Sequence, residues 1–160
     1  ESYKRSDFKA AVTRGVNKNS GPFTFDFYHR LSQVQLELIA GDDIMLEDLL
    51  DAEITLKNVI TDGFYSYTGG NPDQVTAGTT IADIIPCGAL HMQDDRVVGK
   101  KAILIPQTLT ATSILEIRIG STVITSNFTN QLTLNSGEST MLSITINREG
   151  LIYFVLDSDW

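Results

Sequence analysis

A stretch of alternating residues between positions 23 and 38 constrains the fold more than any other part of the sequence. Core-type residues occupy odd positions in its first half and even positions in its second half, namely Phe23, Phe25, Phe27, His29 and Leu31, then Val34, Leu36 and Leu38. Alternation with a period of two predicts a β-strand with one buried face. Because a shift of one residue turns every side chain to the opposite face, the change of phase predicts a β-bulge at Ser32 and Gln33. We therefore expect one long, bent strand over residues 23–38, around which the other strands are arranged.

The remainder of the chain predicts many short strands separated by turns. Apolar or alternating segments predict the strands, which we place at 52–59, 64–67, 79–86, 88–93, 102–107, 114–119, 122–126, 132–134, 141–146 and 151–156. Asp62 and Gly63 form a hairpin signal, and so do Gly120 and Ser121. One short helical turn is expected over residues 44–50, with Asp43 as its cap. Many short strands with almost no helix predict an all-β fold, specifically an antiparallel β-sandwich.

Length and composition fit a single folded unit. The chain has 160 residues, of which 42% are hydrophobic, enough for one domain or for one domain with a fragment of another. Residues 1–20 are polar and mixed, and a loop-like segment begins at Gly15. We interpret residues 1–20 either as the end of a preceding domain or as an irregular N-terminus. The sequence begins with Glu1 and has no signal peptide, so we expect a mature form or a trimmed segment.

The net charge of −8 argues against two classes of partner. Nucleic acid calls for a basic stripe, and an anionic lipid surface attracts clusters of lysine and arginine. From the charge we therefore predict no binding to nucleic acid. Separately, no apolar run in the sequence approaches the roughly 18 residues of a membrane-spanning helix.

Residues that carry catalysis or bind metals are few and scattered. Two histidines and one cysteine do not form a structural zinc set. We interpret His29 as a hydrogen-bonded core or edge histidine. Cys87 is interpreted as a small buried hydrophobe rather than as a nucleophile paired with His91.

Acidic residues gather at 42–43, 94–95 and 157–159, but none of these groups has the spacing of a calcium-binding loop. Turns collect aspartate for local hydrogen-bonding reasons. The 20 acidic residues single out no pair of facing carboxylates such as a glycosidase needs. The sequence therefore predicts a protein that is not an enzyme, with no metal site and no cofactor.

Three stretches occur in an order that matches a known family. The first is the run Phe25-x-Phe27-x-His29-x-Leu31-Ser32-x-Val34-x-Leu36-x-Leu38, and the second is Ile-Leu-Ile-Pro-Gln-Thr-Leu at 103–109. The third starts with Leu132-x-Leu134-x-x-Gly137, continues through 142–147 and 150–151, and ends near Trp160. Together they resemble the fimbrillins of Bacteroidales, the subunits of type V pili and related surface proteins. The segment at 7–11 is similar to the last strand of the N-terminal domain of those proteins.

The resemblance implies two transthyretin-like β-sandwich domains in tandem. Residues 1–20 would then be the end of the N-terminal domain and a linker, and residues 21–160 would be the C-terminal domain. It also implies a secreted precursor and a place at the cell surface or in the fimbrium, associated with the outer membrane. The export signal and processing site of the family fall in the N-terminal domain, and we do not assign the processing site to Arg14.

The resemblance further implies assembly rather than catalysis. Such subunits polymerise head to tail when a strand of one fills a groove in the next, which is a form of β-augmentation. The candidate donor is the last strand, with Leu151, Tyr153 and Val155 on one face and Ile152, Phe154 and Leu156 on the other. Because both faces are apolar, a central strand buried inside this same domain is the alternative. The implied partners are other fimbrial subunits and a ligand on a host or bacterial surface.

A second function remains open from the sequence. A carbohydrate-binding module on a similar sandwich would use exposed aromatic residues beside a loop. Tyr65 and Tyr67, close to Gly69 and Gly70, are the candidates, although residues of this kind also serve in packing.

Overall fold

The structure is a computed structural model, and it describes residues 7–67, 74–150 and 152–157. One short 3-10 helix, η1 (Leu46–Asp51), lies among strands. The strands are β1 (Lys9–Ala10), β2 (Tyr28–His29), β3 (Ser32–Ala40), β4 (Glu53–Ile60), β5 (Gly63–Ser66), β6 (Gln74–Ala77), β7 (Ile81–Ile84), β8 (His91–Gln93), β9 (Arg96–Leu104), β10 (Gln107–Leu109), β11 (Ile114–Ile119), β12 (Thr122–Asn127), β13 (Leu132–Leu134), β14 (Ser139–Ile146) and β15 (Ile152–Asp157). In the described part of the chain, no helix is both long and apolar enough to cross a membrane.

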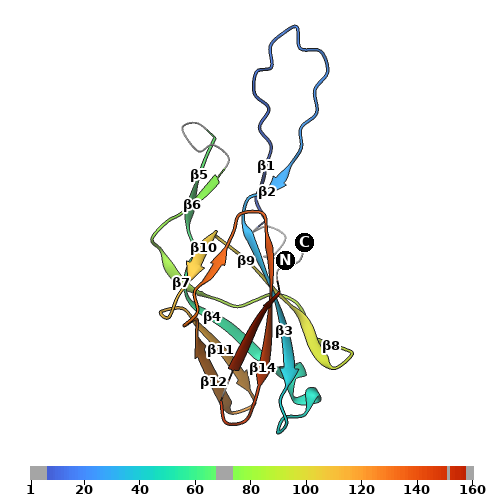
Figure 1. Cartoon of the computed structure of the whole chain (residues 1–160), viewed down its shortest axis with the longest axis vertical. Coiled ribbons are helices and arrows are strands. Elements are labelled where there is room, and N and C mark those ends of the chain that lie inside the picture. Colours follow the sequence, from blue (N-terminus) through green and yellow to red (C-terminus); the bar gives the residue numbers. More distant parts are fainter. Residues whose placement is uncertain (1–6, 68–73, 151, 158–160) are drawn as a thin grey trace.

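Two sheets form the body of the molecule (Figure 1). One has five strands in the order β15-β14-β3-β9-β8, and the other has four in the order β12-β11-β4-β7. Two-stranded ribbons β1–β2, β5–β6 and β10–β13 complete the described strands. The predicted all-β sandwich is confirmed. Among the described strands, β3 and β14 form a parallel pair, in register from Gln33–Ser139 to Ala40–Ile146.

The core lies between the two sheets and follows the period-two pattern of their central strands. Alternate residues of β3, β14, β4 and β11 are buried, including Val34, Leu36, Leu38, Leu142, Ile144, Ile146, Ile54, Leu56, Leu115 and Ile117. Full burial of such a side chain stabilises the fold by about 1.5–3 kcal/mol. The predicted inward positions of Ile54 and Leu56 are confirmed.

The predicted long strand over residues 23–38 is wrong. Strand β3 begins only at Ser32, and Phe23, Phe25 and Phe27 are 52%, 49% and 66% exposed. The residues between β1 and β2 instead form an arm, residues 11–27, which projects from the top of the molecule in Figure 1. The aromatic alternation therefore belongs mostly to a segment outside the sandwich.

The change of phase has a different cause from the predicted bulge at Ser32 and Gln33. Arg30 and Leu31, between β2 and β3, are not part of a strand, and the loop after β13 binds them. The hydroxyl of Ser136 donates to the carbonyl of Arg30 at 2.9 Å, and the N–H of Gly137 donates to the carbonyl of Leu31 at 2.9 Å. The irregularity in β3 lies instead between Leu36 and Glu37, opposite β9.

The Asp-Gly hairpin signal at residues 62–63 is also wrong, because β5 pairs with β6 while β4 pairs with β7 and β11. The carboxylate of Asp62 accepts the N–H of Thr80 at 2.8 Å, and the backbone carbonyl of Asp62 accepts the N–H of Gly78 at 2.9 Å. Asp62 thus joins two antiparallel segments at the point where the β4–β7 pair continues into the β5–β6 pair. By contrast, the hairpin predicted at Gly120 and Ser121 is confirmed, with β11 and β12 paired on either side of it.

Candidate functional site

Strand β15 covers all but one of the residues predicted as a donor strand. Leu151 lies outside the described residues, and Ile152, Tyr153, Phe154, Val155 and Leu156 lie in β15. The strand pairs antiparallel with β14, from Ile152 opposite Ile146 to Asp157 opposite Met141. Strand β15 comes last in the order of its sheet, so in the described part of the chain its second edge has no strand partner. Among the described strands β15 is thus an edge strand, paired within the sheet of this same domain.

The neighbouring strand β14 is held independently of β15. It pairs with β3 along its whole length, and its Leu142, Ile144 and Ile146 are fully buried. The loss of β15 would uncover one row of backbone groups on β14 while the pairing of β14 with β3 remained. As an edge strand, β15 has a second row of backbone N–H and C=O groups with which no described strand pairs.

The turn between β14 and β15, residues 147–150, is fixed by the loop that follows β3. The N–H of Gly41 donates to the carbonyl of Ile146 at 2.8 Å, and the N–H of Arg148 donates to both carboxylate oxygens of Asp43 at 3.1 Å. A Cβ on Gly41 would lie 2.8 Å from the backbone carbonyl oxygen of Ile146, which cannot move aside as a side chain can, so this close approach requires glycine. Gly150, with a φ of 80°, adopts the left-handed conformation that lets the chain enter β15.

The structure corrects the predicted role of Asp43. The helical turn is present as η1, but its N-cap residue is Met45, and no side chain caps it. The Asp43 carboxylate binds a turn more than a hundred residues away instead. Side chains of this type hydrogen-bond readily to backbone N–H groups, and here the recipient is distant in sequence.

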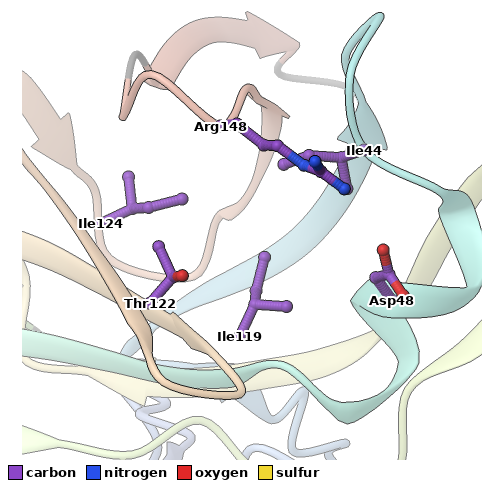
Figure 2. Close-up of a pocket in the computed structure, with 6 residues that line it drawn as sticks. All are labelled: Ile44, Asp48, Ile119, Thr122, Ile124 and Arg148. Atoms are coloured by element: carbon purple, nitrogen blue, oxygen red, sulfur yellow. The ribbon is translucent and has the colours of Figure 1, made fainter.

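A pocket of about 430 Å³ lies beside the same turn (Figure 2). Its described lining comes from the loop before η1, from η1, from the β11–β12 hairpin and from the β14–β15 turn. The residues are Ile44, Asp48, Ile119, Thr122, Ile124 and Arg148. Sequence reasoning missed this pocket because its lining comes from three distant segments.

The remaining sequence candidates lie elsewhere. His29 is exposed rather than buried, and its Nδ1 lies 2.7 Å from Oδ1 of Asp7. The prediction of a hydrogen-bonded edge histidine is confirmed, while its place on a buried face is wrong. Cys87 is half-buried, and its backbone exchanges two hydrogen bonds of 2.8 Å with Lys101. Nδ1 of His91 lies 3.3 Å from the carbonyl oxygen of Ala89.

The acidic groups form no metal centre within residues 7–67, 74–150 and 152–157, where no three histidine, cysteine or acidic side chains gather. Asp95 instead forms an ion pair with Arg96 at 3.2 Å. Arg96 also donates to Glu37 at 2.9 Å, which raises the pKa of the guanidinium. These contacts stabilise the outer face of the five-stranded sheet.

The two tyrosines proposed for carbohydrate binding differ in their surroundings. The ring of Tyr65 packs edge-on against Phe8, with centroids 5.0 Å apart. Tyr67 is 66% exposed, and Gly69 and Gly70 lie outside the described residues. The contact with Phe8 supports a packing role for Tyr65.

Comparison with protein families decides the identity of this sandwich. A family model described as fimbrillin-like matches residues 1–157, nearly the whole chain. The chain belongs to the fimbrillin-like family. The resemblance seen in the sequence is thereby confirmed, and a search of curated proteins finds no significant match.

Solved structures share the fold of this fimbrillin-like chain. A candidate cell adhesion protein of Bacteroides uniformis matches with a TM-score of 0.72 and 20% identity, over 96% of this chain and 59% of that one. A candidate cell adhesion protein of Bacteroides ovatus matches with a TM-score of 0.63 and 20% identity, over 87% of this chain and 47% of that one. The chain thus spans about half to three-fifths of the length of these two structures.

Proposed function

We propose that this fimbrillin-like protein is a non-enzymatic subunit of surface fimbriae, or a related adhesion protein, that joins its neighbours by donating residues 151–156. Family membership supports the fimbrial role. The observation that carries strand donation is the edge position of β15, because β15 can leave β14 without breaking any other pair among the described strands. A head-to-tail contact that does not close on itself makes a filament.

The proposed partners are other fimbrial subunits, together with a ligand on a host or bacterial surface. The proposed location is the cell surface or the fimbrium, in association with the outer membrane. Strand donation requires no cofactor, since backbone hydrogen bonds supply the affinity and alternate side chains supply the specificity.

We also propose that residues 1–20 are the end of a preceding domain and a linker, and that residues 21–160 are the C-terminal domain. The exposed apolar residues of the arm, among which the rings of Phe23 and Phe25 touch with centroids 5.2 Å apart, support this division, because an exposed apolar patch marks an interface. These residues are Val12, Val16, Phe23, Phe25 and Phe27. In a longer protein that contains the preceding domain, hydroxyl-radical labelling of the three phenylalanines should fall well below its level in the 160-residue chain. Equal labelling in the two proteins would contradict the division.

A reversible tether tests strand donation directly. Thr145 and Tyr153 lie opposite each other in the β14–β15 register, and Cβ atoms of such pairs are about 4.5–5.5 Å apart, near the range that a disulfide bridges. In a Cys87→Ser background, the variant Thr145→Cys/Tyr153→Cys should form no protease-dependent oligomers when oxidised and should form them again when reduced. Size exclusion and electron microscopy measure the oligomers.

A matched tether within the other sheet provides the control. Arg118 and Val123 are opposite in the β11–β12 register, so Arg118→Cys/Val123→Cys cross-links a hairpin without restraining β15. This variant should assemble in both redox states. A version truncated after Gly150 should stay folded by circular dichroism and fail to assemble. Strand donation by β15 is ruled out if the oxidised β14–β15 tether assembles as well as the control tether.

A further inference from the structure

The pocket beside the β14–β15 turn has the size and lining of a small-molecule site. Its volume of about 430 Å³ falls within the range of roughly 300–1,000 Å³ that is usual for such sites. It lies at one end of the sandwich, where the β11–β12 hairpin, the loop carrying Ile44 and the turn carrying Arg148 converge (Figure 2).

Three isoleucines supply an apolar floor. Ile119 continues the inward parity of Leu115 and Ile117 on β11, and Ile124 lies opposite Ile117 on β12. Ile124 is only 3% exposed, and Ile44 and Ile119 are half-buried against the core. The inner face of the four-stranded sheet therefore extends past the packed core and forms a surface suited to an aliphatic group.

Two opposite charges line the same pocket without pairing with each other. Within the part of the chain that the structure describes, neither the Arg148 guanidinium nor the Asp48 carboxylate takes part in an ion pair. Asp43 fixes the backbone of Arg148, which limits where its side chain can reach. Thr122 adds a hydroxyl to the lining.

We propose that this pocket binds an apolar amino-acid residue through its α-carboxylate and its aliphatic side chain. A guanidinium binds a carboxylate through two parallel hydrogen bonds, which assigns the carboxylate to Arg148. The isoleucines receive the side chain. Asp48 is placed to bind an ammonium group, which a free amino acid has and the C-terminal residue of a polypeptide lacks.

A titration followed by ¹H–¹⁵N NMR tests the proposal on the 160-residue protein. The probes are L-leucine, N-acetyl-L-leucine without the ammonium, and L-leucinamide without the carboxylate. Leucine or N-acetyl-leucine should shift the amide signals of Ile44, Ile119, Thr122 and Ile124 saturably. Leucinamide should bind about tenfold more weakly, the effect expected when a charge-assisted hydrogen bond is lost.

The two acids distinguish the sources of the ligand. Tighter binding of leucine than of N-acetyl-leucine supports a free amino acid held also by Asp48, and equal or tighter binding of N-acetyl-leucine supports a polypeptide C-terminus. The proposal fails if no probe shifts the pocket signals saturably, or if leucinamide binds as well as both acids.

Two arginine variants separate the pocket from general charge effects. Arg148→Gln should weaken the binding of the better acid about tenfold, to the level of leucinamide. Arg118→Gln removes an exposed arginine that pairs with Glu53 at 3.7 Å and does not line the pocket, so it should bind as the parent does. Unchanged affinity in Arg148→Gln, with its NMR spectrum otherwise intact, would overturn the assignment.

Discussion

The carboxylate of Asp43 accepts the backbone N–H of Arg148 with both of its oxygens, at 3.1 Å each, across 105 residues of sequence. This contact joins the loop after β3 to the turn that precedes β15. It is the side-chain contact that fixes the near end of the proposed donor strand, beside the backbone bond from Gly41 to Ile146.

Asp43→Ala should therefore loosen the β14–β15 turn. The expected loss in the free energy of unfolding is about 1 kcal/mol, the usual contribution of one hydrogen bond. Hydrogen exchange at the Arg148 amide should become faster, while exchange in the β11–β12 hairpin should stay the same. Asp42→Ala is the matched control, because the described residues make no hydrogen bond to its side chain. Equal exchange rates in the two variants would contradict the role of Asp43.

Replacing a side chain by alanine should cost far more stability in the second half of the alternating stretch, residues 23–38, than in its first half. Leu36→Ala empties a fully buried position and should cost about 2–5 kcal/mol in the free energy of unfolding. Phe25→Ala removes a half-exposed ring of the arm and should change this free energy by less than about 0.5 kcal/mol. Urea denaturation measures both. If Phe25→Ala lowered the free energy of unfolding about as much as Leu36→Ala does, the result would instead support the single long strand predicted over residues 23–38.

The stability of the β4–β7 region should depend on pH through Asp62. Its pKa lies below the ordinary value of 3.8 because the backbone N–H and the hydroxyl of Thr80 donate hydrogen bonds to the carboxylate. A depressed pKa adds stability that is fully present above 3.8 and is lost as the pH falls through the folded-state pKa. The stability difference between the parent and Asp62→Asn should therefore be largest at neutral pH and shrink in acid. A difference that stays constant from neutral pH into acid would show that the charge of Asp62 is irrelevant.

Tyr65 and Tyr67 provide the test between assembly and carbohydrate binding. Tyr67→Ala should leave stability and assembly unchanged, because its side chain is exposed. Tyr65→Ala should lower stability by about 1 kcal/mol through loss of the aromatic pair with Phe8. Neither variant should alter binding to a glycan array. Loss of glycan binding in the double variant, with assembly intact, would favour the carbohydrate-binding module.

Local pattern was sufficient for much of the sandwich. Alternating burial placed the inward residues of β4, and a two-residue loop with a leading glycine placed the β11–β12 hairpin. Both features depend on neighbours in sequence. The edge strand β15 was located by its apolar run, whereas its place in the sheet order was not visible in the sequence.

The features that the sequence did not predict share one physical cause, because each depends on residues that are distant in the sequence. Alternating aromatic residues at 23–27 look identical whether or not a sheet packs against them. The break before β3 depends on hydrogen bonds from Ser136 and Gly137, and the role of Asp43 depends on Arg148. The pocket likewise combines three segments that no local motif connects.

The parallel pairing of β3 with β14 sets the order in which this chain acquires its structure. The paired residues Gln33 and Ser139 are 106 positions apart, so the middle of the five-stranded sheet closes only after residues 139–146 are available. Contacts of such long range slow folding, because the entropy of closing the loop is lost before the contacts form. The β3–β14 pair therefore cannot form during synthesis until β14 has been made. Strand β15 pairs with β14 and can join the sheet only after that point.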